Sequence, residues 1–541
     1  VTVLIYEQTC AAEKRRRRKK GQLADPPRRL FIYDAVCEGC GDCSAQSNCV
    51  AVLPHETPLG RKRRIDQSSC NKDYSCAKGF CPSFVSVSGG RPRRKMGALQ
   101  SASAAFEQHV AALPHPTAHV WDAPYDLLVT GVGGTGVVTV GAVIAMAAHL
   151  EGKSASVLDF MGFAQKGGSV LSFVRLADVP ERLNQVRIDT QQADAVLACD
   201  IVVAPSPEAL QTVRRGRTRL LVNTHEVPVA ESIRNPDASL QVDQLIDKLE
   251  FAAGPGQLET FDAQALAEDF LGDTIVANIL AMGYAWQRGL VPLSLAAMQR
   301  AIELNGVAVP TNLLAFSLGR LAAARPELCQ SLLEAPAQGS ALQVPGDLEA
   351  LRRQAGELLG AYQNAAYARR HDELVQAVLA REQALGLSPG GALSQTVARS
   401  ALKLMAYKDE YEVARLYSTP AFREALAQQF EGELQLAFHM APPLLARGRN
   451  GQPPAKLRLG AWMLPAMRLL ARGKALRGTP LDVFGHTAER RMERALIQAY
   501  EARVHELLPL INAERLPLAL ELLALPLSMR GFGHVKARNV E

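Results

Sequence analysis

Seven of the ten cysteines lie in one short region, and their thiols could bind a metal. They are Cys37, Cys40, Cys43, Cys49, Cys70, Cys76 and Cys81. Disulfides are typical of small secreted domains, but residues 1–20 lack the apolar core of a signal peptide. Structural zinc uses paired C-x2-C units. Residues 37–43 instead have the pattern C-x2-C-x2-C, a spacing at which three thiols can bind one corner of an iron–sulfur cube. The spacing favours an iron–sulfur site, with zinc as the alternative.

The number of clusters depends on the wider spacing in the second half of this region. Pro82 follows Cys81, and a Cys-Pro pair closes the bacterial ferredoxin motif. We therefore assign the thiols of one 4Fe–4S cluster to Cys37, Cys40, Cys43 and Cys81. The other three cysteines are one thiol short of a second cube, which would need a non-cysteine ligand, a distant cysteine or an open iron.

Glycine-rich loops form the second candidate site. Residues 125–130 predict a buried strand that runs into GVGGTG (131–136), a helix and a second strand at 154–160. This order is typical of a β-α-β unit in which glycines let a phosphate or another backbone approach the helix. A dinucleotide fold would place a ribose beside Asp159, whereas the plainer interpretation is tight strand-to-helix packing. The candidate positions are Gly131, Gly133, Gly134 and Gly136, with Lys166, Gly167, Gly168 and Ser169 in a second loop.

Length and charge limit the class of protein. A chain of 541 residues is expected to form three or four domains. No run approaches the roughly 20 apolar residues of a membrane helix, so we expect a cytoplasmic protein. The net charge is +6, with basic runs at 13–20, 61–64 and 91–95. The runs could be a solvated face or a linker. As a binding surface they lack the interleaved aromatic residues that nucleic-acid binding favours, so nucleic acid is an unlikely partner and an acidic protein fits better.

The remaining regions are helical or linker-like. Apolar residues recur at helical spacing from about residue 340 onward. A solvated or paired helix face is expected from Glu489, Arg490, Arg491, Glu493 and Arg494. We expect His439, His486 and His534 to be structural. The chain starts at Val1 within the strand-like run VTVLIYEQTC, which suggests a fragment of a longer protein.

Several segments resemble one enzyme family. GVGGTGVVTVGAVIAMAA, FMGFAQKGGSVLSFVRL and NGVAVPTNLLAFSLGR resemble the gamma domain of 2-oxoacid:ferredoxin oxidoreductases. CEGCGDC…SNC together with RKRRIDQSSCNKDYSC…KGFCPSF resembles the long, fused indolepyruvate ferredoxin oxidoreductases. The run VTVLIYEQTCAAEKRRRRKKG is similar to the last strand and basic tail of their thiamine diphosphate domain.

The resemblance implies a function. The family decarboxylates an aryl 2-oxoacid on thiamine diphosphate and Mg²⁺, passes electrons through 4Fe–4S clusters to ferredoxin, and transfers the acyl group to coenzyme A. Its gamma domain is not an NAD domain, so the glycine loops are expected to serve packing or to contact the phosphate of coenzyme A or thiamine diphosphate. Many gamma domains carry Gln where this chain has Thr135. No Gly-Asp-Gly motif occurs, so we do not expect the chain to bind thiamine diphosphate alone. The family is usually a homodimer.

The predicted architecture has a ferredoxin-like iron–sulfur module, an α/β Rossmann-like gamma domain with an open, mostly parallel sheet, and an all-α C-terminal region. Its segments are 1–29 (end of a thiamine diphosphate domain and basic linker), 30–90 (iron–sulfur module), 91–121 (linker), 122–330 (gamma domain), 331–395 (helical linker) and 396–541 (helical domain). The alternatives are an NAD(P)H-linked iron–sulfur reductase and a non-catalytic, metal-stapled protein that binds nucleic acid.

Overall fold

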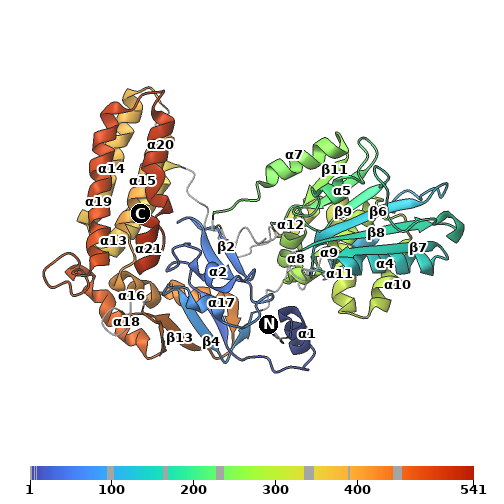
Figure 1. Ribbon diagram of the computed structural model, residues 1–541, viewed down its shortest axis with the longest axis horizontal. Coiled ribbons are helices and arrows are strands. Elements are labelled where there is room, and N and C mark those ends of the chain that lie inside the picture. Colours follow the sequence, from blue (N-terminus) through green and yellow to red (C-terminus); the bar gives the residue numbers. More distant parts are fainter. Residues whose placement is uncertain are drawn as a thin grey trace. The chain divides into compact units, whose positions relative to one another are not determined.

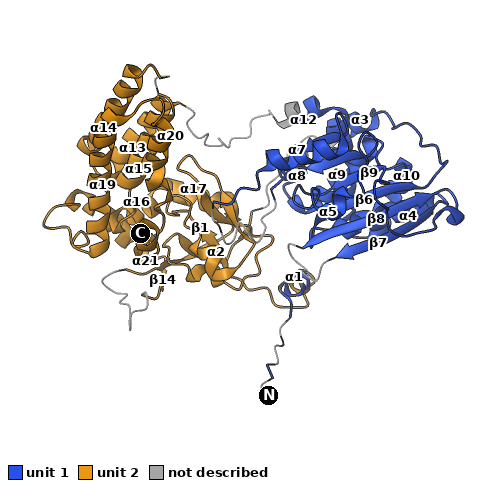
Figure 2. Ribbon diagram, turned by 45° about the horizontal axis from the view of Figure 1, so that its top comes forward, with its two compact units in different colours: residues 1–16, 94–232, 237–339 blue, residues 17–93, 233–236, 340–541 orange. Residues whose placement is uncertain are grey.

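The computed structural model describes residues 3–4, 7, 9–93, 103–161, 168–226, 235, 237–333, 347–387, 390–442 and 454–541. The chain forms two compact units, coloured separately in Figure 2. Unit 1 comprises residues 1–16, 94–232 and 237–339, and unit 2 comprises residues 17–93, 233–236 and 340–541. Within the described residues, no helix has the length and apolarity needed to cross a membrane. The short helix α1 (Ala11–Lys19) spans the boundary between the two units.

Unit 1 is built on a six-stranded sheet with the order β11-β10-β9-β6-β8-β7. Strands β6, β9, β10 and β11 are parallel neighbours, whereas β8 is antiparallel to both β6 and β7. The strands are β6 (Tyr125–Val132), β7 (Ser154–Met161), β8 (Ser169–Ala177), β9 (Ala195–Ala198), β10 (Arg219–Asn223) and β11 (Leu258–Phe261).

The sheet confirms the expectation of an open, mostly parallel sheet in part, because three of its five strand pairings are parallel but the two pairings of β8 are antiparallel. Helix α4 (Val137–Leu150) does lead from β6 to β7, but β8 lies between those two strands. Burial explains the order: β8 is buried along nearly its whole length, whereas β7 is only partly buried and ends in exposed residues. An apolar strand gains most from a central place, and the half-buried strand is left at the edge.

Helices surround this sheet (Figure 1). They are α3 (Ser103–Ala111), α4, α5 (Pro207–Leu210), α7 (Val242–Ala253), α8 (Ala263–Leu271), α9 (Ala277–Gln287), α10 (Leu295–Asn305), α11 (Val309–Ala324) and α12 (Pro326–Leu333). Helices α9 and α11 approach each other closely: a Cβ at Gly319 would lie 1.9 Å from the Leu280 oxygen, and one at Gly283 would lie 2.0 Å from the Phe316 oxygen. Glycine at both crossing points therefore permits the backbone contact that forms the core.

Unit 2 contains the cysteine region, residues 29–92. Its elements are β1 (Arg29–Ile32), α2 (Asp42–Ser47), β2 (Val52–His55), β3 (Lys62–Ile65), the 3-10 turn η1 (Ser75–Lys78), β4 (Phe84–Ser88) and β5 (Arg91–Pro92). Strands β2 and β3 form an antiparallel hairpin, and β1 pairs with β4.

Unit 2 also contains the C-terminal region. Its helices are α13 (Leu348–Tyr362), α14 (Ala365–Ala384), α15 (Ala392–Met405), α16 (Glu410–Ser418), α17 (Pro420–Gln429), α18 (Met463–Arg472), α19 (Ala488–Leu507), α20 (Leu516–Ala524) and α21 (Gly533–Val540). The expectation of an all-α region was wrong, because β12 (Phe430–Glu431), β13 (Gln435–Met440) and β14 (Leu457–Gly460) also occur.

These strands join the C-terminal region to the cysteine region. Strand β13 pairs with β4, which gives a four-stranded sheet of order β1-β4-β13-β14, and β12 pairs with β5. Apolar residues from both regions share one core, in which Phe438 of β13 is fully buried beside Tyr417 and Phe422. Pairing with β13 satisfies the backbone groups along the edge of β4 that β1 leaves open. The cysteine region and the C-terminal region are therefore parts of one folded unit.

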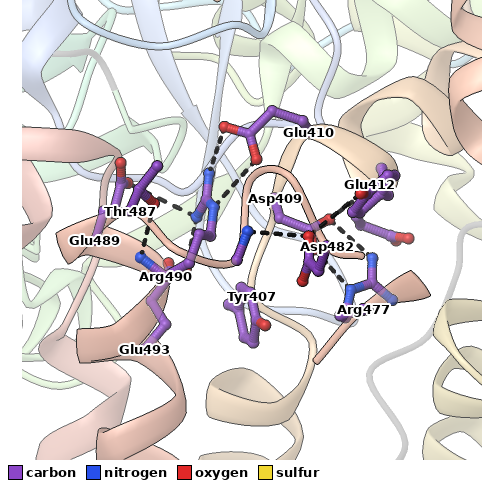
Figure 3. Close-up of polar contacts among 12 residues, drawn as sticks. Tyr407, Asp409, Glu410, Glu412, Arg477, Asp482, Thr487, Glu489, Arg490 and Glu493 are labelled. Carbon is purple, nitrogen blue, oxygen red and sulfur yellow. Dashed lines mark hydrogen bonds and ion pairs between the residues drawn. The ribbon is translucent and has the colours of Figure 1, made fainter. Parts of the chain in front are cut away.

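Buried ion pairs connect the helices of the C-terminal region (Figure 3). Arg477 binds Asp409 through two hydrogen bonds of 2.6 and 2.8 Å. Arg490 lies between Glu410 and Glu493, at 3.2 and 2.5 Å. Arg490 and Glu493 belong to the charged run predicted to form a solvated or paired face, and both are paired and buried.

Candidate functional site

The first cysteine group consists of Cys37, Cys40, Cys43 and Cys81. Three of these thiols are buried and Cys40 is partly buried. Burial raises the pKa of Cys43 well above its ordinary value, and the charges of the other three thiols raise it further. Burial and the neighbouring Cys37 raise the pKa of Cys81 to about 11. Thiols that influence one another in this way lie close together, so the structure gathers the four residues that the spacing assigned to one cluster. Their role as iron ligands stays a prediction.

The second cysteine group consists of Cys49, Cys70 and Cys76. Burial, followed by the charges of Cys70 and Cys49, raises the pKa of Cys76 to about 12. Burial also raises the pKa of Cys70, and the charge of Cys49 adds to this effect. All ten cysteines of the chain are free thiols, so disulfides do not explain either group.

The turns around the thiols explain the small residues between them. Gly39 and Gly41 have φ of 69° and 76°, which glycine adopts without strain. A Cβ on Gly39 would lie 2.1 Å from the Arg61 oxygen, so the loop that carries Cys37 and Cys40 could not close against β3 with a larger residue. The turn points the Gly39 amide at the Cys37 sulfur, at 3.3 Å.

Hydrogen-bond donors are directed at sulfur in both groups. The Lys72 amide donates to the Cys70 sulfur at 3.4 Å, and the Ser83 hydroxyl lies 2.9 Å from the Cys81 sulfur. Such donors stabilise the thiolate over the thiol, and they are the usual partners of sulfur ligands in metal sites. Clustered thiols with donors on sulfur fit the requirements of an iron–sulfur cluster.

Four lysines, which we call the lysine shell, line the first cysteine group. Lys62 is buried, and Lys403, Lys408 and Lys456 are partly buried. Lys403 and Lys408 bind the Glu38 carboxylate at 3.1 and 2.7 Å. The lysine ammonium groups also reach the backbone of the cysteines, since Lys408 donates to the Cys37 oxygen at 3.1 Å.

Lys456 contacts the other end of the same group. It donates to the Cys81 oxygen at 2.8 Å, and its ammonium lies 4.9 Å from the centre of the Phe84 ring. Burial lowers the pKa of Lys456, whereas the thiols of Cys81 and Cys43 raise it. Cation and thiolate therefore stabilise each other's charged form.

The charge balance of the lysine shell is positive. Burial and the neighbouring Lys408 lower the pKa of Lys62 to about 7, although Glu38 opposes this. Although burial disfavours the Glu38 carboxylate, Lys403 and Lys408 hold its pKa well below the usual range. One carboxylate thus faces several buried or partly buried lysine ammonium groups, so the site has an excess of positive charge that suits a set of thiolates.

Sequence reasoning missed the lysine shell. Three of its members come from the C-terminal region, far along the chain from the residues that they contact. Lys403, for example, lies 365 residues after Glu38. The one local signal was the basic run at 61–64, which was interpreted as a surface for an acidic partner. Lys62 and Arg63 of that run are buried in β3, so they do not form a solvent-exposed surface for nucleic acid or for a protein.

No three His, Cys, Asp or Glu side chains in the described part of the chain converge on a single metal ion. The thiols of an iron–sulfur cube bind different iron atoms, so they surround a wider space than the ligands of one ion do.

The two glycine loops of unit 1 meet at the ends of β6 and β8. The Gly133 amide donates to the Gly168 oxygen at 2.7 Å, and Ser169 is in register with Val132. Lys166 and Gly167 lie outside the described residues. The structure therefore brings together the described parts of both predicted loops.

Packing accounts for part of the glycine requirement. A Cβ on Gly131 would lie 2.7 Å from Val137 and 3.0 Å from the Asp200 carboxylate, which accepts the Val132 amide. Gly134 and Gly136 differ from Gly131, because they are exposed and have φ of 89° and 102°. Gly136 precedes α4, so exposed backbone lies at the N-terminus of a helix, where phosphate can bind.

The adjacent polar groups are held in place. Asn278 donates to the Thr135 oxygen at 3.0 Å, and the Thr135 hydroxyl donates to the Val132 oxygen at 2.8 Å. The ribose role considered for Asp159 does not fit this arrangement. Asp159 lies on β7, in register with Ser172, and β8 separates it from the strand that carries the first glycine loop.

Two family models match the chain. Residues 126–322 match the pyruvate ferredoxin/flavodoxin oxidoreductase family. Residues 348–541 match a family of unknown function, DUF6537.

Individual relatives match about a third of the chain. The chain is 29% identical to the indolepyruvate oxidoreductase subunit IorB of Pyrococcus horikoshii over 37% of this chain and 96% of the relative. It is 30% identical to the common gamma subunit of the pyruvate/ketoisovalerate oxidoreductases of Thermococcus kodakarensis, over 32% of this chain and 82% of the relative. Among solved structures, the gamma subunit of a keto/oxoacid ferredoxin oxidoreductase from Geobacter sulfurreducens is 25% identical over 37% of this chain and 98% of that chain, with a TM-score of 0.27.

The α/β domain with its paired glycine loops, and the relatives that match it, define the class: subunits of oxidoreductases that act on 2-oxoacids. The chain belongs to the 2-oxoacid:ferredoxin oxidoreductase family.

Proposed function

We propose that this chain carries the electron-transfer region and the gamma domain of an indolepyruvate or other aryl-2-oxoacid ferredoxin oxidoreductase. The enzyme would decarboxylate the 2-oxoacid, form an acyl-coenzyme A and pass the electrons to ferredoxin. The observation that carries the proposal is the gathering of seven free thiols into two groups, with the lysine shell against the first of them.

The first cysteine group would hold a 4Fe–4S cluster through Cys37, Cys40, Cys43 and Cys81. Such a cluster accepts and releases one electron at a time. The residues of the chain provide the rest: the thiols bind iron, backbone amides donate to sulfur, and the lysine shell offsets the negative charge of four thiolates.

The gamma domain would serve the acyl-transfer part of the reaction. Exposed backbone at Gly134–Gly136, at the start of α4, could bind a phosphate of coenzyme A or thiamine diphosphate. Because the chain has no Gly-Asp-Gly motif, we assign thiamine diphosphate and Mg²⁺ to another part of the complete enzyme. We further propose that the enzyme is a homodimer, as the resemblance implies, and that it is cytoplasmic.

The test is iron and sulfide analysis of the anaerobically purified chain, with electron paramagnetic resonance (EPR) after reduction by dithionite. The parent protein is expected to absorb broadly near 400 nm and to give a cluster signal on reduction. Cys40→Ala should abolish the signal of the first cluster, whereas Cys329→Ala, a buried thiol of unit 1, should leave it unchanged. A colourless protein that contains zinc and no iron would refute the proposal.

A further inference from the structure

The second cysteine group has the same spacing as the first, with one substitution. Cys37, Cys40 and Cys43 follow the pattern C-x2-C-x2-C, and Cys70 and Cys76 are separated in the same way by an aspartate, Asp73, at the middle position. Asp73 therefore stands where the first motif has Cys40.

The two motifs also exchange their final cysteines. In ferredoxins with two clusters, the fourth cysteine of each motif ligates the cluster of the other motif. Cys81 follows the second motif and lies with the first group, and Cys49 follows the first motif and lies with the second group. By this correspondence, the second group lacks only the equivalent of Cys40.

The backbone around Asp73 has the same conformation as the backbone around Cys40. Gly39 and Gly41, which flank Cys40, have φ of 69° and 76°. Lys72 and Tyr74, which flank Asp73, have φ of 56° and 65° although neither is glycine.

The hydrogen bond to sulfur is repeated as well. The amide two residues after the first cysteine of each motif donates to that cysteine, from Gly39 to Cys37 at 3.3 Å and from Lys72 to Cys70 at 3.4 Å. The same local geometry therefore places Cys40 and Asp73 at equivalent positions relative to their neighbouring thiols.

Contacts outside the motif hold the strained residues in place. The Tyr74 hydroxyl donates to the Arg28 oxygen at 2.8 Å, and the Arg28 guanidinium lies 3.7 Å from the centre of the Tyr74 ring. Lys72 forms an ion pair with Asp25. Positive φ at a non-glycine residue is unfavourable and persists where the surroundings fix it, often at functional sites.

The Asp73 carboxylate is able to take part in a cluster. Its Oδ1 accepts hydrogen bonds from the amide and hydroxyl of Ser75, at 3.1 and 2.9 Å. Asp73 lies three residues from Cys70 and three from Cys76, so it stands midway between these two thiols along the turn. Carboxylates bind iron in proteins, although they are harder ligands than thiolates.

We propose that Asp73 is the fourth ligand of a second 4Fe–4S cluster, which it completes together with Cys49, Cys70 and Cys76. This inference rests on the proposed electron-transfer function and adds to it a second, mixed thiolate and carboxylate site. The second cluster would have one iron bound through oxygen at the exposed end of the group.

The test compares the full chain with Asp73→Ala, Asp73→Cys and a matched control. Asp66 is that control, because its Oδ1 accepts the amide and hydroxyl of Ser68 at 2.9 and 2.8 Å, as Asp73 does with Ser75, but it does not lie between cysteines of the motif. Each protein is purified anaerobically, its iron and sulfide are measured, and EPR spectra are recorded before and after reduction by dithionite.

We expect about eight irons per chain in the parent protein, the content of two 4Fe–4S clusters. Asp73→Ala should lose at least one iron per chain and change the EPR signal of one cluster only. Asp73→Cys should keep the full iron content with an altered EPR signal of that same cluster, and Asp66→Ala should match the parent in both measurements.

Two results would overturn the inference, and they differ from failure of the proposed function. If the parent holds one cluster that Cys40→Ala removes and Asp73→Ala leaves intact, the electron-transfer function stands and the role of Asp73 is wrong. If Asp73→Ala and Asp66→Ala give the same iron content and spectra, Asp73 shapes the turn and binds no iron. A parent protein without any iron–sulfur cluster would refute both proposals.

Discussion

Replacing Lys456 with methionine tests whether the C-terminal region controls the electronic properties of the first cysteine group. Lys456 donates to the Cys81 oxygen at 2.8 Å, and the oxygen and sulfur of one cysteine are about 4 Å apart by covalent geometry. The ammonium therefore lies within about 7 Å of the sulfur, and we take about 8 Å as its mean distance from an electron spread over a cluster. Methionine keeps an unbranched apolar chain against the Phe84 ring, so we expect the fold to be retained.

The magnitude follows from Coulomb's law. At an effective dielectric constant of about 20, a unit charge about 8 Å from the added electron stabilises the reduced state by about 2 kcal/mol. One electron corresponds to about 2.3 kcal/mol per 100 mV, so Lys456→Met should lower the midpoint potential by about 50–90 mV once relaxation of the surroundings is allowed for. The sign is negative because removing a cation disfavours the more negative, reduced cluster.

The assay is a redox titration followed by EPR, with the signal of the first cluster identified by its loss in Cys40→Ala. Arg468→Met is the control, because this arginine is exposed on α18 and solvent screens its charge. An unchanged potential in Lys456→Met, or an equal shift in both variants, would show that the lysine shell does not act on the cluster.

Three further predictions concern stability, each measured by denaturant unfolding. Gly319→Ala should destabilise unit 1 by about 3 kcal/mol, because the new Cβ would lie 1.9 Å from a backbone oxygen of α9. Gly356→Ala is the control: a Cβ there meets nothing within 4 Å, so this change should stabilise α13 by about 0.5–1 kcal/mol. Equal effects of the two substitutions would contradict the close contact between α9 and α11. Asp409→Asn should cost about 3–5 kcal/mol, because it leaves the buried Arg477 of Figure 3 without its charge partner, and a loss below about 1 kcal/mol would argue against this. Burial, with nearby cations, lowers the pKa of His439 to about 4. As the pH drops, the unfolded chain therefore takes up a proton at this histidine before the folded chain does. The free energy of unfolding should fall by about 1–2 kcal/mol between about pH 6.5 and about pH 4, after allowance for solvent screening. His439→Gln should remove that part of the pH dependence, and an unchanged profile would refute the assignment.

Local patterns in the sequence predicted three elements around the first glycine loop of unit 1. The run at 125–130 lies in β6, the helix after the first glycine loop is α4, and the run at 154–160 lies in β7. These elements follow from hydrophobic periodicity and from glycines at the turns, which act over a few residues. The position of β8 between β6 and β7 was not predicted, because the order of strands depends on which strand gains most from burial on both faces.

The sequence also indicated which thiols belong together. The C-x2-C-x2-C spacing and Pro82 after Cys81 assigned four cysteines to one group, and the structure gathers those four. The spacing could also have singled out Asp73, because it stands midway between Cys70 and Cys76. Its proposed role as a ligand, however, depends on the matching backbone φ angles of the two motifs, which only the structure provides.

The lysine shell and the shared sheet were decided by tertiary structure alone. Lys403 reaches Glu38 across 365 residues, and β13 pairs with β4 from a region predicted to be entirely helical. Residue spacing carries information about turns and helices because neighbouring residues are covalently tied. It carries little about which distant cation will neutralise a buried carboxylate or which strand will cover an open sheet edge, since both depend on the free energy of the whole folded unit.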